Sequence, residues 1–230
     1  MKVTEFHYPP GIDLTMIQTD KFKSAALSAS FLVPLKKETA AANALVPYVL
    51  RRGTERYPTM GEISVRLEEL YGGTLDPAVR KRGETQCVGL IGSFLDDAYA
   101  LESGSNLQEA AALLEEMLLH PVTENGAFKE EYVSGEREKL VQAIRAQIND
   151  KRQYAMLRLL QEMCRDEHCG VDPLGGEADM AAVTAQDAWN AYQGLLKHAR
   201  LHLFYCGTAD AEEVKKALEG LMKGVHALQG

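Results

Sequence analysis

Strand-like pairs alternate with helix-like pairs along the chain, and this order constrains the possible folds more than any other feature of the sequence. Apolar runs bounded by polar turns predict one strand pair at 13–19 and 23–33 and another at 74–80 and 86–94. The run RLHLFYCG predicts a further strand near the C-terminus, followed by an amphipathic helix. We therefore predict an α+β fold, with a mixed or antiparallel sheet covered by helices, formed by residues 1–230 as a single domain.

The predicted helices lie between these strands. In TMGEISVRLEELYGG, Thr59 is an N-cap and Glu62 follows three residues later, which is a capping box, and the Gly72-Gly73 pair ends the helix. Apolar spacing predicts further helices at 107–120, 184–198 and 208–222, and two within 128–164. The segment ESGSN, residues 102–106, is the best candidate for a loop.

A further helix, in NALVPYVLRRGT, contains a residue that helices normally exclude. Its apolar residues recur at helical spacing and Gly53 is a natural stop, yet Pro47 stands inside it. An interior proline removes one backbone hydrogen bond and clashes with the preceding turn, at a cost of roughly 3 kcal/mol. The presence of Pro47 therefore needs an explanation.

The charge balance excludes one class of partner. The formal net charge is −8 and the pI is about 5.3, whereas binding to nucleic acid depends on lysines and arginines that displace counterions. The start MKVTEFHYPPG has no apolar signal-peptide core, and no apolar stretch is long enough for a membrane span, so we expect a cytoplasmic protein. The cysteines are too few and too scattered for a disulfide framework, and we expect reduced thiols at Cys87, Cys164, Cys169 and Cys206.

Several local motifs together resemble the pitrilysin/insulinase family of zinc metallopeptidases, which includes the mitochondrial processing peptidases. Active members carry H-x-x-E-H on the first helix, followed by a phrase like F-K-G-T. Here RRGTERYPTMGEISVRLEELYGGTL resembles that phrase with the helix, Gly-Gly turn and edge strand after it. The segment GEREKLVQAI resembles the region of the third zinc ligand, and LHLFYCGTADAEEV resembles the unit that closes the domain. The resemblance covers nearly the whole chain and implies a LuxS/mitochondrial-processing-peptidase-like metallohydrolase domain.

Anchored on Gly53 and Thr54, the family motif H-x-x-E-H becomes A-x-x-P-Y in this chain. The motif's chemistry needs two imidazoles four residues apart to bind zinc, and a glutamate to take a proton from zinc-bound water. Ala44 has no ligand atom, Pro47 has no carboxylate, and Tyr48 has only a phenol, whose unperturbed pKa is about 10. The resemblance therefore implies an inactive, YmfF-type member with no metal and no cofactor, and Pro47 stands at the lost general-base position.

The third zinc ligand of active members is a glutamate seven residues after the glutamate of an R-E-K-like phrase. Counted from Glu138 in REK, this position falls on Arg145, a permanent cation that would repel a divalent ion. Glu138 remains as a vestige of the site and lies two helical turns from Arg145, so the two can belong to a structural ion-pair cluster. The alternative is that both are ordinary solvated charges on a helix.

Active members hold substrate as an added strand along the edge strand after the Gly-Gly turn. The corresponding vestigial edge strand here is Asp76, Pro77, Ala78 and Val79. Strand addition uses main-chain donors and Pro77 lacks one, so we do not expect peptide binding in the family's usual register. A proline that protects an edge strand against aggregation explains the residue equally well.

The segment CRDEHC offers weaker candidate chemistry. Cys164, His168 and Cys169 are close in sequence, but a second pair of ligands at fixed spacing is missing. By position the segment resembles the family's H-P-Y-G loop, so structural thiols and a structural histidine are the favoured interpretation.

Two classes of function remain open. In the first, the chain is a non-catalytic scaffold or partner subunit that forms a heterodimer with an intact H-x-x-E-H relative in peptide processing. In the second, it is a peptidase or hydrolase whose site has been rebuilt with other residues. Family chains usually hold two or more domains of this size, so we expect an N-terminal domain whose other partners are a second domain of its own chain and, as candidate ligands, peptides.

Overall fold

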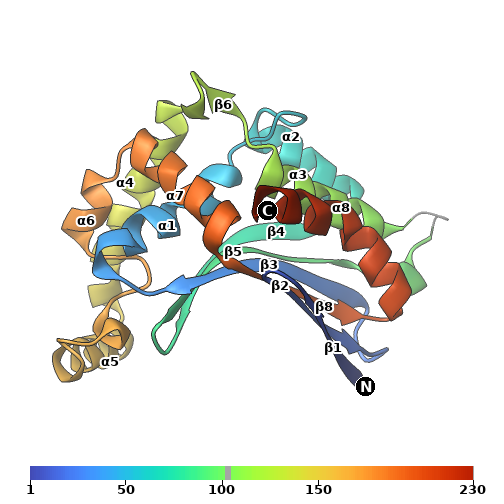
Figure 1. The fold of residues 1–230 in the computed structure, drawn as a ribbon, viewed down its shortest axis with the longest axis horizontal. Coiled ribbons are helices and arrows are strands. Elements are labelled where there is room, and N and C mark those ends of the chain that lie inside the picture. Colours follow the sequence, from blue (N-terminus) through green and yellow to red (C-terminus); the bar gives the residue numbers. More distant parts are fainter. Residues whose placement is uncertain (102–104, 230) are drawn as a thin grey trace.

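The strands form one mixed sheet, described by a computed structural model that covers residues 1–101 and 105–229 (Figure 1). Six strands lie in the order β1-β2-β8-β3-β5-β4, with β2 and β8 parallel and the other neighbours antiparallel. Their bounds are β1 Lys2–Tyr8, β2 Ile12–Gln18, β3 Ser24–Pro34, β4 Thr74–Arg82, β5 Thr85–Leu95 and β8 Arg200–Gly207. A small hairpin pairs β6 Thr123–Glu124 with β7 Ala127–Phe128.

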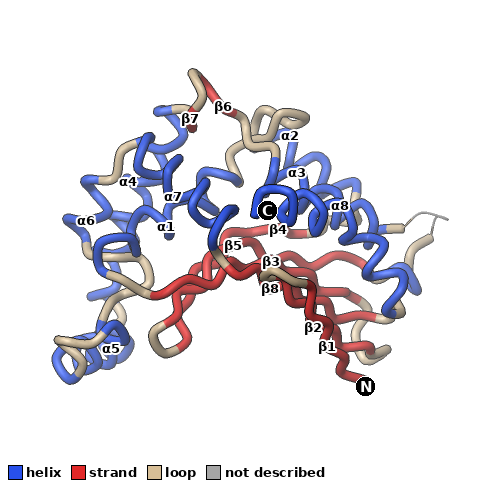
Figure 2. Tube along the Cα trace, viewed as in Figure 1, coloured by secondary structure: helices blue, strands red, loops and turns tan. Residues whose placement is uncertain are grey.

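Helices cover one face of this sheet, and the opposite face is open (Figures 1 and 2). In β3 the residues that point towards the helices are buried, from Ala25 to Phe31 at every second position, as expected of a sheet covered on that side. The α+β fold class predicted from the sequence is thus confirmed. The helices are α1 Lys37–Leu50, α2 Met60–Glu69, α3 Asn106–Leu119, α4 Glu130–Ala146, α5 Lys151–Met163, α6 Glu177–Ala182, α7 Ala185–His198 and α8 Ala211–Gln229.

The helix predicted from TMGEISVRLEELYGG is α2, and its capping box is present. The Thr59 hydroxyl accepts a hydrogen bond from the Glu62 N–H at 3.3 Å, while the Glu62 carboxylate accepts one from the Thr59 N–H at 2.8 Å. At the other end, Gly72 has a φ of 71°, a conformation that glycine adopts without strain. The chain then turns directly into β4.

Strand β4 forms one edge of the sheet, and helix α5 lies apart from the other helices at the lower left of Figure 1. All residues of α5 are exposed or half-buried. Within the described residues, no helix is both long and apolar enough to cross a membrane. The segment predicted as a loop, 102–106, falls partly on residues 102–104, which lie outside the described residues; Ser105 is the N-cap of α3.

Candidate functional site

Helix α1 presents on one side the three positions that align with H-x-x-E-H. Ala44 and Tyr48 are four residues apart and Pro47 lies next to them, so all three share a helix face. Ala44 is completely buried and Pro47 is buried, whereas Tyr48 is half-buried. The helix continues through Pro47, because the Pro47 carbonyl still accepts a hydrogen bond from the Arg51 N–H at 3.2 Å.

These three side chains do not fit a zinc ion. The methyl group of Ala44 and the ring of Pro47 carry no donor atom. Burial raises the pKa of the Tyr48 phenol, and the negative charge of Glu136 raises it further. The phenol therefore stays protonated at neutral pH, which makes it a poor metal ligand. The face can pack against other side chains, but it has no group that would bind or activate water through a metal.

The residue of α4 that reaches the end of α1 is Glu136. Its carboxylate is buried and accepts hydrogen bonds from Arg52 Nη1 at 3.1 Å and Lys139 Nζ at 2.7 Å. The Arg52 guanidinium also lies 5.0 Å from the centre of the Tyr132 ring, a cation–π distance. The ion pair of Glu136 with Arg52, whose guanidinium also contacts the Tyr132 ring, thus joins α4 to the end of α1 beside Tyr48.

Glu138 and Arg145, the α4 residues considered from the sequence, lie elsewhere. Glu138 is exposed, because the buried positions of α4 are Val133, Glu136 and Leu140. Arg145 is 63% exposed and its Nη2 lies 2.7 Å from Glu177 Oε1, which raises the pKa of the guanidinium. The structure therefore does not pair Glu138 with Arg145.

Arg145 also lies at the far end of α4 from Glu136. It lines the same pocket as Lys37, the first residue of α1, whereas Glu136 contacts Arg52 just beyond the last residue of α1. The two helices therefore run in opposite directions, and Arg145 lies nine positions after Glu136, about 13.5 Å along the helix at 1.5 Å per residue. This places Arg145 away from Tyr48.

The segment Asp76, Pro77, Ala78 and Val79 lies in the edge strand β4. Asp76 is exposed, and its Oδ1 is 3.9 Å from Nε of Arg51, at the limit of an ion pair. Among the described residues, Nε and Nη1 of Arg51 are buried with no hydrogen-bond partner. The edge strand β4 and the end of α1 thus meet at Arg51, whose guanidinium has buried N–H groups without hydrogen-bond acceptors in the part of the chain that the structure describes.

The segment CRDEHC forms the loop after α5, and the structure brings Cys164 and Cys169 together with Glu167 rather than with His168. A hydrogen bond with the Cys164 side chain is the largest cause that raises the pKa of the Cys169 thiol to about 11, and burial and Glu167 add to it. The loop lies near the N-terminal end of α1, since Glu167 and Gly170 line the same pocket as Lys37, and Tyr48 is eleven residues further along that helix.

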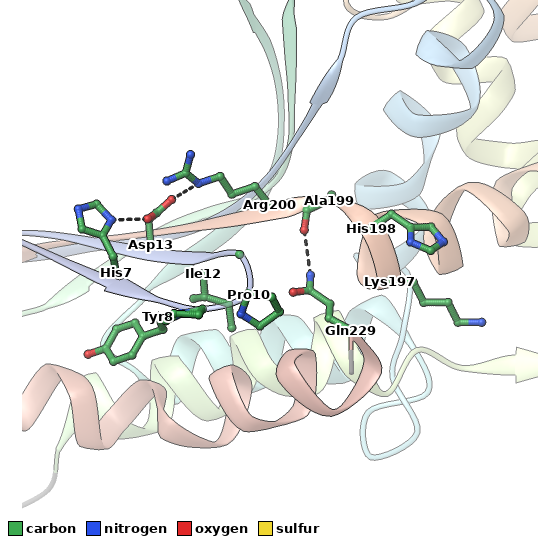
Figure 3. Close-up of a pocket in the computed structure, with 12 residues that line it drawn as sticks. His7, Tyr8, Pro10, Ile12, Asp13, Lys197, His198, Ala199, Arg200 and Gln229 are labelled. Carbon is green, nitrogen blue, oxygen red and sulfur yellow. Dashed lines mark hydrogen bonds and ion pairs between the residues drawn. The ribbon is translucent and has the colours of Figure 1, made fainter.

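A separate charged cluster flanks a pocket beside the β1–β2 turn (Figure 3). Asp13 is bracketed by His7, whose Nδ1 lies 2.5 Å from Asp13 Oδ1, and by an ion pair with Arg200. Asp13 lies on the open face of the sheet, because it alternates along β2 with the buried Ile12 and Leu14. On the same strand, Thr15 is hydrogen-bonded to His202 Nε2 of β8 at 3.0 Å. The cluster joins β2 to β8 and β1.

Sequence reasoning missed Glu136, Arg51 and Tyr132. The signal for Glu136 was present, because its spacing from Val133 and Leu140 is that of a buried helix face. The positions of Arg51 and Tyr132 depend on how α1, α4 and β4 meet, which local sequence does not encode.

No family model matches the chain. It is 31% identical over 213 residues to a protein of Bacillus subtilis (strain 168) described as "Probable inactive metalloprotease YmfF", an alignment that covers 93% of this chain and 50% of that protein. A solved structure described as a conserved protein from Enterococcus faecalis V583 is 27% identical, with a TM-score of 0.86, and the match covers 95% of this chain and 52% of that one.

A second solved structure extends the comparison of the fold. The peptidase M16 inactive domain from Pseudomonas fluorescens has a TM-score of 0.73 at 11% identity, with 97% of this chain and 51% of that chain covered. The chain thus spans about half the length of these relatives.

The mixed sheet with helices on one face is the fold of M16 peptidase domains, and in this chain Ala44, Pro47 and Tyr48 of the first helix offer no zinc ligand. Over nearly its whole length the chain is thus similar to a probable inactive metalloprotease, and its fold is that of M16 peptidase domains.

Proposed function

We propose that this chain is a non-catalytic scaffold or partner subunit for a catalytically intact relative in peptide processing. One observation carries the proposal: α1 keeps its place and its burial in a peptidase fold, although Ala44, Pro47 and Tyr48 supply neither metal ligands nor a general base. A fold that is retained without its chemistry can still contribute walls, charge and orientation to a site completed by another chain or domain.

Residues 44, 47 and 48 are, in this proposal, the vestigial site, and Asp76, Pro77, Ala78 and Val79 its vestigial substrate edge. On α4 the geometry supports Glu136, in place of Glu138, as the residue facing this site. Glu136 forms an ion pair with Arg52, and its negative charge raises the pKa of the Tyr48 phenol. Its carboxylate is occupied by two cations, so it is a structural group.

The proposed partners are an intact family relative, in a heterodimer, and a second domain of the protein's own full-length chain. The half-length coverage of the relatives supports residues 1–230 as one domain of a longer protein. Exposed apolar side chains on and beside α5 support association, because apolar surface of this kind is characteristic of contact sites. They are Ile148, Met156, Leu159 and Met163. A cytoplasmic location, suggested by the sequence, is part of the proposal.

Co-expression of the full-length protein with an intact relative tests the proposal. We expect a complex on size-exclusion chromatography and faster peptide hydrolysis by the relative when this protein is present. Leu159→Glu, which places a charge on the apolar face of α5, should weaken the complex. Val65→Glu is the matched control, because Val65 is 56% exposed on α2 and Leu159 is 53% exposed on α5.

A relative that is fully active alone and never co-purifies with this protein would overturn the scaffold role.

A further inference from the structure

The loop after α5 gathers three ligand-type side chains at one point. One ligand atom from each of Cys164, Glu167 and Cys169, the two Sγ atoms and a carboxylate oxygen, lies within 4.8 Å of the others. Cys169 Sγ donates to Glu167 Oε2 at 3.4 Å. This cluster plays no part in the site on α1.

The backbone of this loop is fixed by its own hydrogen bonds. The Cys164 carbonyl accepts from the Glu167 N–H at 3.0 Å, and the Glu167 carbonyl accepts from the Gly170 N–H at 3.1 Å. A Cβ at Gly170 would lie 2.2 Å from the Cys164 carbonyl oxygen, so the turn closes only around glycine. The spacing of the two cysteines in space is therefore set by the fold of the loop and not by the side chains alone.

A contact with the sheet holds the loop from outside. Lys81 Nζ, on β4, donates to the Cys169 carbonyl at 2.8 Å and to the Val171 carbonyl at 3.0 Å. The ligand cluster is thus attached to the β4–β5 hairpin on one side and to the C-terminal end of α5 on the other.

We propose that Cys164, Glu167 and Cys169 bind a divalent cation of the zinc class, with the fourth coordination position open to water. Two thiolates and one carboxylate are a ligand set that suits zinc and not magnesium or calcium, which prefer oxygen. Metal–sulfur bonds of about 2.3 Å in a tetrahedral site place two sulfurs roughly 4 Å apart, which the cluster permits with little movement. On binding, the thiol protons pass to solvent as the two metal–sulfur bonds form.

Such an ion would fix the orientation of α5. It would join the last turn of this helix to the loop that Lys81 attaches to the sheet, and α5 carries the exposed side chains of Met156, Leu159 and Met163. The site is independent of the scaffold role, so its absence would leave that proposal unchanged.

Titration of the reduced protein with Co²⁺ tests this site, because cobalt bound to thiolate gives a ligand-to-metal charge-transfer band that oxygen ligands do not give. We expect one equivalent of Co²⁺ to produce the band and Zn²⁺ to abolish it by displacement. The double variant Cys164→Ser/Cys169→Ser should lose the band while its far-ultraviolet circular dichroism stays unchanged. Cys206→Ser, which alters a thiol of β8, is the matched control and should keep it.

A second variant covers the case in which the double variant does not fold. Glu167→Gln keeps both thiols, so it should keep the charge-transfer band but bind Co²⁺ more weakly than the unaltered protein. Absence of the band in the reduced protein, or a band of equal strength in a folded Cys164→Ser/Cys169→Ser variant, would overturn the proposal.

Discussion

Glu136 holds α4 against the end of α1, and its removal should be costly. The carboxylate is 8% exposed and paired with Arg52, which is 24% exposed. Loss of one partner of a buried pair leaves the other charge uncompensated. We expect Glu136→Ala to lower the free energy of unfolding by about 1–3 kcal/mol, less than for a fully buried pair because water reaches Arg52.

Chemical denaturation measures this effect, with Glu138→Ala as the matched control. Glu138 is exposed two residues away on the same helix, so its substitution should change the free energy of unfolding by less than about 0.5 kcal/mol. Equal losses for the two variants would contradict the placement of Glu136.

The exchange of Glu138 for Glu136 shows what sequence could and could not predict about the site. The sequence alone predicts that Ala44, Pro47 and Tyr48 supply no ligands, because the residues of a motif on one helix lie at fixed distances along the sequence. The spacing of Val133, Glu136 and Leu140 indicates which face of α4 is buried, but which residue of that face meets α1 depends on how the two helices pack.

Pro47→Ala should not harm the fold. The substitution restores a backbone donor inside α1 and removes the clash of the ring with the preceding turn, which together are worth up to about 3 kcal/mol, while the buried ring contributes some packing that alanine loses. We expect an unchanged or higher melting temperature by calorimetry. A loss of more than about 1 kcal/mol would show that the geometry imposed by Pro47 is needed for packing.

Arg51 should be dispensable for stability. Its Nε and Nη1 are buried without a partner among the described residues, and its contact with the exposed Asp76 is 3.9 Å long. Arg51→Met keeps the apolar stem and removes the unsatisfied donors, so we expect a gain of about 1 kcal/mol in the domain alone. Arg80→Met, at an exposed position of β4, is the control and should be neutral.

A clear loss of stability in Arg51→Met and none in Arg80→Met would mean that Arg51 has a partner in the folded domain.

At the scale of elements, the strands and helices with strong periodicity were predicted and the weak ones were not. β3 and β5 fall within a few residues of their expected bounds because each is a largely buried apolar run, and α2 does so because a capping box and a Gly-Gly pair mark its ends. β1 was missed because its residues are mostly exposed or half-buried, and α6 because it has only 6 residues. Helix α1 begins at Lys37, earlier than the apolar run in NALVPYVL indicates.

The pairing of β2 with β8 should depend on pH. The hydrogen bond from Arg200 is the main cause that lowers the pKa of Asp13, and His7 lowers it further against the effect of burial. A carboxyl group whose pKa is lowered on folding stabilises the protein above its unfolded pKa, near 3.8, and this contribution is lost as the pH falls through the folded value.

Acid titration of unfolding free energy measures this contribution. Asp13→Asn should be less stable than the unaltered protein at neutral pH and should lose less stability as the pH falls below about 4. Parallel acid titration curves for the two proteins would contradict the role of Asp13.

At the scale of the whole molecule, the sheet is covered by helices on one face only, and β4 is a free edge (Figure 2). The exposed apolar residues of α5 lie beyond this sheet. In the proposed scaffold role, a domain with these surfaces and with no zinc ligand at residues 44, 47 and 48 would complete a chamber whose chemistry comes from another domain or chain. The fold class and the missing zinc ligands could be predicted from the sequence. The exposed β4 edge and the apolar surface of α5 could not, because they depend on how the strands and helices are arranged in space.

Hydrolysis by the assembled complex tests the central claim most directly. The intact relative would carry glutamine in place of the glutamate of its H-x-x-E-H motif, and peptide cleavage would be measured with and without this protein. We predict that cleavage falls at least about 10²-fold, because the general base belongs to the relative alone. Cleavage that persists in the complex and falls on substitution of Tyr48 or Glu136 would contradict the account and show a rebuilt active site in this chain.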